Sequence, residues 1–264
     1  MRYAILSDLH ANAQAWAAVK RDFESQGVDA VLCLGDVVGY GPEPSRVLEE
    51  VYAVCHNFVL GNHDAVICNK INSDIFNDDA KFTIEWTRQQ LNQGASDFFG
   101  EVPMTLDGGD FLLSHAEVAH PERFDYIYEP SEASAHFAAC PHSLIFIGHT
   151  HFPCAIYTGQ TGQTGYLPNE DLTLNPTLRY LVNVGSVGDP RNGDTRSHYV
   201  IYDSERGQLF FRKVPFDVEA YRRALLKSAL PTRPILFDYL GTPIPDLAAA
   251  EPVRGDRGSQ ALAD

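Results

Sequence analysis

Short, mostly apolar segments that end in polar side chains recur along this chain and limit the folds open to it. The segments span residues 3–7, 29–34, 57–60, 110–114 and 144–147, and an Asp, Asn or His follows each one within two residues. Apolar runs of this length between turn residues are typical of buried β-strands. The sequence therefore predicts a β-sheet core whose strands deliver polar groups at their ends.

The first two of these strands are joined by a helical pattern at residues 13–24, with Asn12 as a suitable N-cap. Two strands connected in this way are parallel neighbours, so their C-terminal ends meet at the same edge of the sheet. Ligands bind at this edge in open α/β sheets. We therefore expect Asp8, His10 and Asp36 to lie side by side.

Further helices and strands are predicted downstream. Helical patterns cover residues 44–54, 77–91, 131–139 and 217–228, and hairpin patterns cover residues 104–114 and 197–214. No internal repeat or linker interrupts residues 1–240, which we expect to form a single domain. Residues 241–264 are rich in Pro, Gly, Ala and charged residues, a composition typical of a disordered tail.

The composition excludes several classes of protein. A net charge of −15 over 264 residues argues against sequence-independent binding to nucleic-acid backbones, although metal ions can invert the local charge and admit a phosphate. The five cysteines form no C-x-x-C pair and indicate reduced thiols. No run approaches the ~18 apolar residues of a membrane helix, and residues 1–7 lack the apolar core of a signal peptide. We expect a cytoplasmic protein with no membrane partner; homo-oligomerisation is left open.

The polar strand ends carry carboxylates, imidazoles and one amide, which divalent Mn, Zn, Fe or Mg accept as ligands. These residues are Asp8, His10, Asp36, Asn62, His63, His115, His149 and His151. The set is too large for one ion and suits two ions ~3.5–4 Å apart that share a bridging carboxylate. Asp36 is the natural bridge because its strand is the middle one of the first unit. Asp8 with His10, and His149 with His151, are spaced so that each pair can reach one ion, and His63 remains as a proton donor.

Each position also has a purely structural interpretation. Asp8 could be an acid at a helix N-terminus, Asn62 a turn residue, His115 a satisfied core histidine, and residues 148–151 a polar turn. Such coincidences at five consecutive strand ends explain the pattern less well than a shared site does. The other histidines lack this placement and are interpreted as surface or supporting residues: His56, His120, His136, His142 and His198.

Together, five short motifs resemble the signature of the calcineurin-like metallophosphoesterases. They are Asp8-x-His10, Gly35-Asp36, Gly61-Asn62-His63-Asp64, His115 and Gly148-His149-x-His151, in the family's order and spacing over about residues 1–200. The resemblance implies an α/β fold, namely a four-layer α-β-β-α sandwich of two mixed sheets flanked by helices. It also implies two divalent metal ions as cofactors, with Mn²⁺ expected first and Fe, Zn, Ni or Mg as alternatives.

The resemblance further implies roles for individual residues. It assigns one ion to Asp8, His10, Asp36 and His151, and the other ion to Asp36, Asn62, His115 and His149. It makes His63 the general acid, and we expect Asp64 to orient the His63 imidazole. The residues expected to contact the substrate are Asn62, His63 and Tyr40.

Within the family, the chain is most similar to the small bacterial and archaeal phosphodiesterase-like branch. Residues 183–188, Asn-Val-Gly-Ser-Val-Gly, resemble that branch's Asn-Pro-Gly-Ser motif, with Val184 in place of proline. Serine/threonine protein phosphatases and symmetrical diadenosine tetraphosphatases carry an arginine after the second motif and a glutamate at the end of the third. Here residues 35–41 contain no arginine and Asp64 closes the third motif. Because that arginine would clamp the phosphate, its absence argues against both subfamilies.

The sequence therefore predicts a dinuclear-metal-dependent phosphoester hydrolase, with a phosphodiesterase as the first choice. We expect in-line attack of a metal-bridging hydroxide on phosphorus while His63 protonates the leaving group. The alternatives are a phosphomonoesterase or nucleotidase, a protein phosphatase, and a non-catalytic scaffold, which the complete set of site residues disfavours.

The expected substrate is a small phosphoester or nucleotide. The loops at the sheet edge, residues 39–44, 65–80 and 117–130, should form its specificity pocket. Four aromatic residues of these loops either stack on a base or pack locally: Tyr40, Phe124, Tyr126 and Tyr128.

Overall fold

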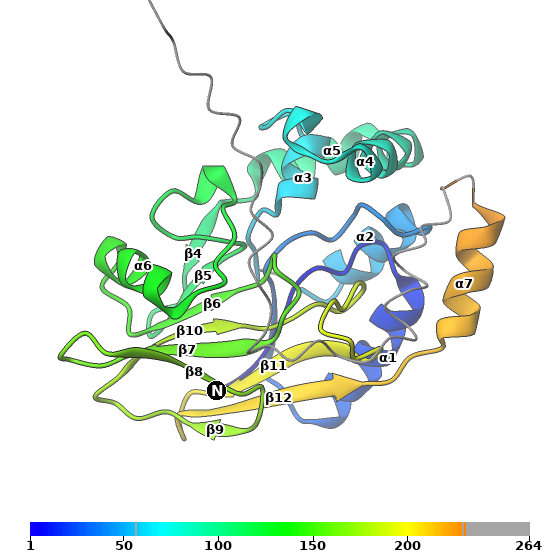
Figure 1. The fold of residues 1–264 in the computed structure, drawn as a ribbon. Helices are drawn as coiled ribbons and strands as arrows, with labels where there is room; N and C mark the ends of the chain where they lie inside the picture. Colours follow the sequence, from blue (N-terminus) through cyan, green and yellow to red (C-terminus); the bar gives the residue numbers. More distant parts are fainter. Residues whose placement is uncertain (56, 229, 231–264) are drawn as a thin grey trace, which may run out of the picture.

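The computed structural model describes residues 1–55, 57–228 and 230. Within them, two mixed six-stranded sheets pack face to face, and helices cover the outer faces (Figure 1). This arrangement confirms the predicted four-layer sandwich. The predicted disordered tail at residues 241–264 and the predicted domain end at residue 240 lie outside the described residues.

The first sheet contains the three N-terminal strands. In spatial order its strands are β3 (Asn57–Phe58), β2 (Ala30–Cys33), β1 (Arg2–Leu6), β11 (Ser197–Asp203), β12 (Gln208–Val214) and β9 (Leu172–Thr173). The strands β1, β2 and β3 are parallel, whereas β11, β12 and β9 are added antiparallel. The parallel part brings the three polar strand ends to one edge, as predicted.

The second sheet repeats this arrangement. In spatial order its strands are β4 (Thr105–Asp107), β5 (Leu112–Ser114), β6 (Leu144–Ile147), β10 (Arg179–Asn183), β7 (Cys154–Thr158) and β8 (Thr164–Leu167). Its middle strands β5, β6 and β10 are parallel. His115 and residues 148–151 therefore follow neighbouring parallel strands.

Seven α-helices and three short 3₁₀-helices occur among the described residues. They are α1 (Ala13–Ser25), α2 (Pro44–Tyr52), α3 (Asn62–Ile67), η1 (Ser73–Ile75), α4 (Asp78–Gln90), α5 (Gln93–Glu101), η2 (Pro121–Arg123), η3 (Pro130–Glu132), α6 (Ala133–Ala139) and α7 (Val218–Lys227). The predicted N-caps are present. Asn12 Oδ1 accepts from the Ala15 amide at 3.0 Å, and Asn77 Oδ1 accepts from the Ala80 amide at 2.9 Å.

Alternation along the strands divides the apolar side chains among three packed layers. In β1, Ala4 and Leu6 join the core beneath α1 and α2, whereas Ile5 points between the sheets. In β6, Phe146 lies between the sheets and Ile145 packs with the α6 residues on the other face. Both sheets are thus buried on both faces, which makes them the inner layers of the sandwich.

Two segments differ in detail from the predicted elements. The third strand ends at Phe58 rather than Leu60, because the Leu60 amide leaves the sheet and donates to the Pro103 carbonyl at 2.8 Å. The predicted helix at residues 77–91 is α4, and the structure adds α3, η1 and α5 on either side of it. In the part of the chain that the structure describes, no helix has the length and apolar character needed to span a membrane.

A partly buried ion pair between Asp22 and Arg212 connects α1 to the first sheet. The Asp22 carboxylate accepts from the Tyr199 hydroxyl at 2.6 Å and from Arg212 Nε and Nη2 at 3.0 and 2.9 Å. Burial opposes the carboxylate charge, but these hydrogen bonds hold the pKa of Asp22 below its usual value.

Replacing Asp22 with asparagine should therefore lower the free energy of unfolding by about 1–2 kcal/mol near neutral pH. Because the folded-state pKa of Asp22 is depressed, its stabilisation is present above the unfolded-state pKa and is lost as the pH falls through the folded-state pKa. Urea denaturation at about pH 7 and about pH 2 measures both limits. Glu24→Gln, which removes only an exposed pair with Lys20, is the control. An equal loss at both pH values would contradict the assignment.

Candidate metal centre

The polar residues that follow the strands of both sheets converge on one buried site. Within the described residues, three groups have donor atoms that all lie within 4.8 Å of one another. The groups are Asp8, His10 and His151; His10, Asp36 and His63; and Asp36, His115 and His149. All of these side chains are buried. The first sheet supplies the carboxylates and the second sheet supplies three of the imidazoles.

The first cluster consists of Asp8, His10 and His151. His151 Nε2 lies 3.2 Å from Asp8 Oδ1 and 3.1 Å from His10 Nε2. The opposite nitrogen of each ring contacts a backbone carbonyl: His10 Nδ1 contacts Val38 O at 3.2 Å, and His151 Nδ1 contacts Asp189 O. A carbonyl can only accept, so each Nδ1 carries the hydrogen and each Nε2 presents a lone pair to the cluster.

The second cluster consists of Asp36, Asn62, His115 and His149. His115 Nδ1 donates to the Leu34 carbonyl at 2.7 Å, so Nε2 is the nitrogen that faces the cluster. That Nε2 atom lies 3.1 Å from Asn62 Oδ1, 3.1 Å from His149 Nδ1 and 3.4 Å from Asp36 Oδ2.

Carboxylate oxygens and imidazole nitrogens therefore converge in both clusters. Asp8 Oδ1 is moreover a buried oxygen without a hydrogen-bond partner among the described residues. A cation would satisfy these converging atoms, and nitrogen and oxygen donors in this combination suit a divalent ion. The residues present thus fit a metal ion in each cluster.

The Asp36 carboxylate links the two clusters. Its Oδ2 atom lies 3.8 Å from His10 Nε2 and 3.4 Å from His115 Nε2, and its Oδ1 accepts from the His63 amide at 2.9 Å. The pairing of His149 with His151, which sequence spacing alone allows, is not what the structure contains. The two rings belong to different clusters, as the family resemblance implies.

The backbone at this site is strained. Five site residues have left-handed backbones: Asp8 (φ 54°), His10 (φ 46°), Asp36 (φ 51°), His149 (φ 66°) and His151 (φ 64°). This conformation is uncommon for residues with side chains and costs of order 1–3 kcal/mol each. Such strain clusters at functional sites because it aims side chains that a regular strand exit would direct elsewhere.

Two glycines make room for the carboxylates. A Cβ atom on Gly61 would lie 2.1 Å from Asp36 Oδ1, and one on Gly148 would lie 2.5 Å from Asp8 Oδ2. Gly61 has an ordinary extended backbone with φ −83°, so it is needed for close approach and not for a special turn.

His63 and Asp64 follow Asn62 on the first turn of α3 but serve different parts of the site. The His63 ring packs against Tyr40 and His10, with ring centres 4.6 and 5.1 Å apart, and its Nδ1 has no hydrogen-bond partner among the described residues. Asp64 does not orient this ring, contrary to expectation. Its carboxylate instead accepts from the Val37 amide at 3.1 Å and so holds the loop that carries Asp36.

Charges within the site favour the forms that bind metals. Burial lowers the pKa of His10 and of His149 to about 3, so both rings are neutral near pH 7. Burial opposes the Asp36 charge, but His115 and His63 hold the pKa of Asp36 well below its usual value. His115 and His151 are exceptions. The Asp36 and Asp8 carboxylates outweigh the burial of His115 and raise its pKa to about 9, and Asp8 and Asp189 raise the pKa of His151 against its burial and the charge of Arg191. A metal ion must therefore displace a proton from His115.

The loop at residues 183–188 hydrogen-bonds to backbone groups beside both clusters. Asn183 Nδ2 donates to the Gly148 carbonyl at 2.7 Å, and the Ser186 hydroxyl donates to the Asp8 carbonyl at 2.8 Å. Val184 donates its amide to the Ile147 carbonyl at 2.9 Å, which the proline of the related motif could not do. The loop thus holds the backbones of two ligand-bearing turns.

Arg191 is a site residue that the sequence motifs do not indicate. Its Nε and Nη2 atoms contact Asp189 Oδ2 at 3.1 and 2.9 Å, and its Cζ lies 5.6 Å from the centre of the Tyr40 ring. Asp189 Oδ2 also lies 3.4 Å from His151 Nδ1. This carboxylate therefore ties the arginine to a residue of the first cluster. The only preceding signal is its position just after the residue 183–188 motif.

The remaining histidines lie outside the clusters. His136 and His198 are buried, whereas His120 is exposed and pairs with Glu122, and His142 contacts Asp107 on β4. His56 lies outside the described residues.

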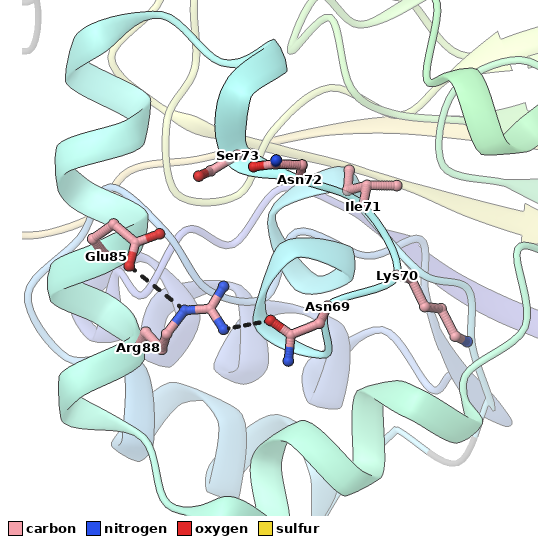
Figure 2. A pocket seen from close by; sticks show the side chains of 7 residues that line it. All are labelled: Asn69, Lys70, Ile71, Asn72, Ser73, Glu85 and Arg88. Atoms are coloured by element: carbon pink, nitrogen blue, oxygen red, sulfur yellow. Dashed lines mark hydrogen bonds and ion pairs between the residues drawn. The ribbon is translucent and has the colours of Figure 1, made fainter.

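A surface hollow between α3 and α4 is separate from the two clusters. Figure 2 shows Arg88 at its centre, bonded to Asn69 Oδ1 at 2.8 Å and facing Glu85. The lining residues are Asn69, Lys70, Ile71, Asn72, Ser73, Glu85 and Arg88, and none of them belongs to the first or second cluster. This part of the predicted 65–80 specificity loop therefore does not line the metal centre.

Known proteins share both the sequence and the fold of this chain. A calcineurin-like phosphoesterase superfamily domain matches residues 1–207. An uncharacterised protein of Methanocaldococcus jannaschii is 31% identical over 232 residues, which cover 86% of this chain and 93% of that protein.

Two solved structures extend this similarity. A metallophosphoesterase from Sphaerobacter thermophilus has a TM-score of 0.78 at 31% identity and covers 90% of this chain and 98% of its own. A hypothetical protein from Pyrococcus horikoshii OT3 has the same fold, with a TM-score of 0.71 at 17% identity over 90% of this chain and 97% of its own. The domain match spans most of the chain and coincides with the buried Asp and His clusters, so this protein belongs to the calcineurin-like phosphoesterase superfamily of metal-dependent hydrolases.

Proposed function

We propose that this protein is a phosphodiesterase that works with two divalent metal ions, Mn²⁺ being the first choice. The observation that carries the proposal is the position of Asp36 Oδ2, within 3.8 Å of an imidazole nitrogen in each cluster. A carboxylate shared in this way is what a two-ion site requires. The first ion would be held by Asp8, His10, Asp36 and His151, and the second by Asp36, Asn62, His115 and His149.

Two bound ions would supply charge neutralisation at the phosphoryl oxygens and acidify the attacking water. The chain itself supplies the proton for the leaving group, from His63. Burial lowers the pKa of His63 to about 4, although Asp36 acts in the opposite direction. The ring is therefore neutral in the free protein, and the negative charge of a bound phosphoester is needed to raise its pKa and protonate it.

Arg191 would bind the phosphoester anion. In the described part of the chain its hydrogen bonds to Asp189 use only Nε and Nη2, so Nη1 is available for a substrate oxygen. Asp189 cancels much of the arginine charge, and residues 35–41 add no second arginine. A diester carries one negative charge where a monoester carries up to two, so limited positive charge favours the diester.

Metal content tests the shared role of Asp36. The wild-type protein loaded with Mn²⁺ and desalted should retain about two ions per chain. Asp36→Asn should lower the metal occupancy of both sites, because the neutral amide lacks the negative charge that both ions would share. His149→Ala should lower the occupancy of one site only. Metal analysis by mass spectrometry gives the stoichiometry, and His120→Ala, at an exposed histidine outside both clusters, is the control. Retention of both ions by the Asp36→Asn variant would exclude Asp36 as a bridging ligand.

Substrate preference tests the reaction. The Mn²⁺-loaded protein should hydrolyse bis(p-nitrophenyl) phosphate with a higher kcat/KM than p-nitrophenyl phosphate. Arg191→Ala should lower kcat/KM for the diester by about 10- to 100-fold, because a charge-assisted hydrogen bond is lost.

The matched control is Arg196→Ala. Arg196 also pairs with an aspartate two residues before it, Asp194, but the pair is exposed on the surface. Its removal should leave kcat/KM within about twofold of wild type. A preference for the monoester, or equal losses in the two arginine variants, would refute the proposal.

Leaving-group dependence tests His63. His63→Ala should lower kcat for a diester with an alkyl leaving group by about 10²- to 10⁴-fold, and should affect a p-nitrophenyl leaving group far less, because p-nitrophenolate leaves without a proton. Metal content should stay at the wild-type value. Equal losses in kcat for both leaving groups would contradict the role of His63 as general acid.

A further inference from the structure

Tyr126 and Tyr128 form a column of stacked rings, here called the tyrosine column, on the His149 ring of the second cluster. The Tyr126 ring lies 4.1 Å from the His149 imidazole, with an angle of 18° between their planes. Tyr128 stacks on Tyr126 in turn, at 5.5 Å and 11°. Tyr126 is 48% exposed and Tyr128 is 51% exposed. Large aromatic surface is therefore accessible immediately beside a proposed metal ligand.

The loop that carries these two tyrosines is anchored in the apolar core by other side chains. Phe124 and Ile127 of the same loop are 5% and 6% exposed. Tyr126 and Tyr128 instead keep about half of their surface accessible. Exposed aromatic side chains gathered at a site are typical of recognition surfaces, because they offer a flat apolar face with little conformational freedom to lose.

The two sides of the metal centre differ in chemistry. Beside the first cluster lie His63, proposed to protonate the leaving group, and Tyr40, whereas Arg191, proposed to bind the anion, is close enough to both Tyr40 and Tyr126 to interact electrostatically with each. Beside the second cluster lies the tyrosine column. A phosphodiester bound across the centre with its leaving group toward His63 would direct its other substituent to the tyrosine side.

We infer that Tyr126 and Tyr128 form a stacking platform for a planar aromatic group, such as a nucleobase, on the substituent that stays with the phosphate. This inference rests on the proposed phosphodiesterase function and adds the substrate class to it. The product of such a reaction carries both the phosphate and the base, as AMP does. Ribose 5-phosphate has the same phosphate and sugar without the base.

Calorimetric binding of these two compounds to the Mn²⁺-loaded protein tests the platform. Stacking of a base on an aromatic side chain predicts that AMP binds about 5- to 150-fold more tightly than ribose 5-phosphate. Tyr128→Leu, which removes the outer ring of the column and leaves Tyr126 on His149, should bring AMP close to ribose 5-phosphate. Tyr128→Phe should preserve the difference, and Tyr126→Leu, which removes the ring beneath, should reduce it by a smaller factor.

Tyr52→Leu is the matched control, since Tyr52 is 61% exposed and contacts the ring of Phe98 at the end of α2. It should change neither affinity. Equal binding of the two compounds to the wild-type protein, or a Tyr128→Leu variant that loses both affinities equally, would overturn the platform. Failure of the proposed function is a separate result, namely absence of Mn²⁺-dependent diester turnover, whatever the binding ratio.

Discussion

Nitrogen and oxygen atoms that converge in a buried space are the constraint on which this structure depends. Backbone carbonyls of Leu34, Val38 and Asp189 accept from three imidazoles at the nitrogens that point away from the site. The remaining nitrogens and the carboxylates then face one another. Buried polar atoms without partners destabilise the folded state, and bound cations would offset this destabilisation.

The double sheet is what holds these mutually repelling groups together. Each sheet buries both of its faces, so neither can slide to relieve the repulsion at its edge. Left-handed residues turn the side chains inward, and the loop at residues 183–188 ties the ligand-bearing turns of the two sheets to each other. Packing in three apolar layers thus offsets the strain concentrated at one edge.

Features with a local signal could be predicted from the sequence. The strands at 197–203 and 208–214 were predicted with their observed bounds, because alternation and a tight turn define both. The parallel order of the first three strands followed from the intervening helices. The two metal-ligand sets required the family resemblance, since spacing alone also allows His149 and His151 to share an ion.

Other features depend on contacts between distant segments. Asp64 adjoins His63 in sequence, yet its carboxylate turns to the Val37 amide, and only the folded loop reveals this choice. Arg191 reaches the site through a loop that carries no ligand, so no motif marks it. Asp189 joins the two regions, because one carboxylate oxygen contacts both Arg191 and His151. Under the proposed function, binding of a phosphoester at Arg191 and binding of an ion at the first cluster would therefore be linked equilibria, in which each ligand would change the affinity of the other by the same factor.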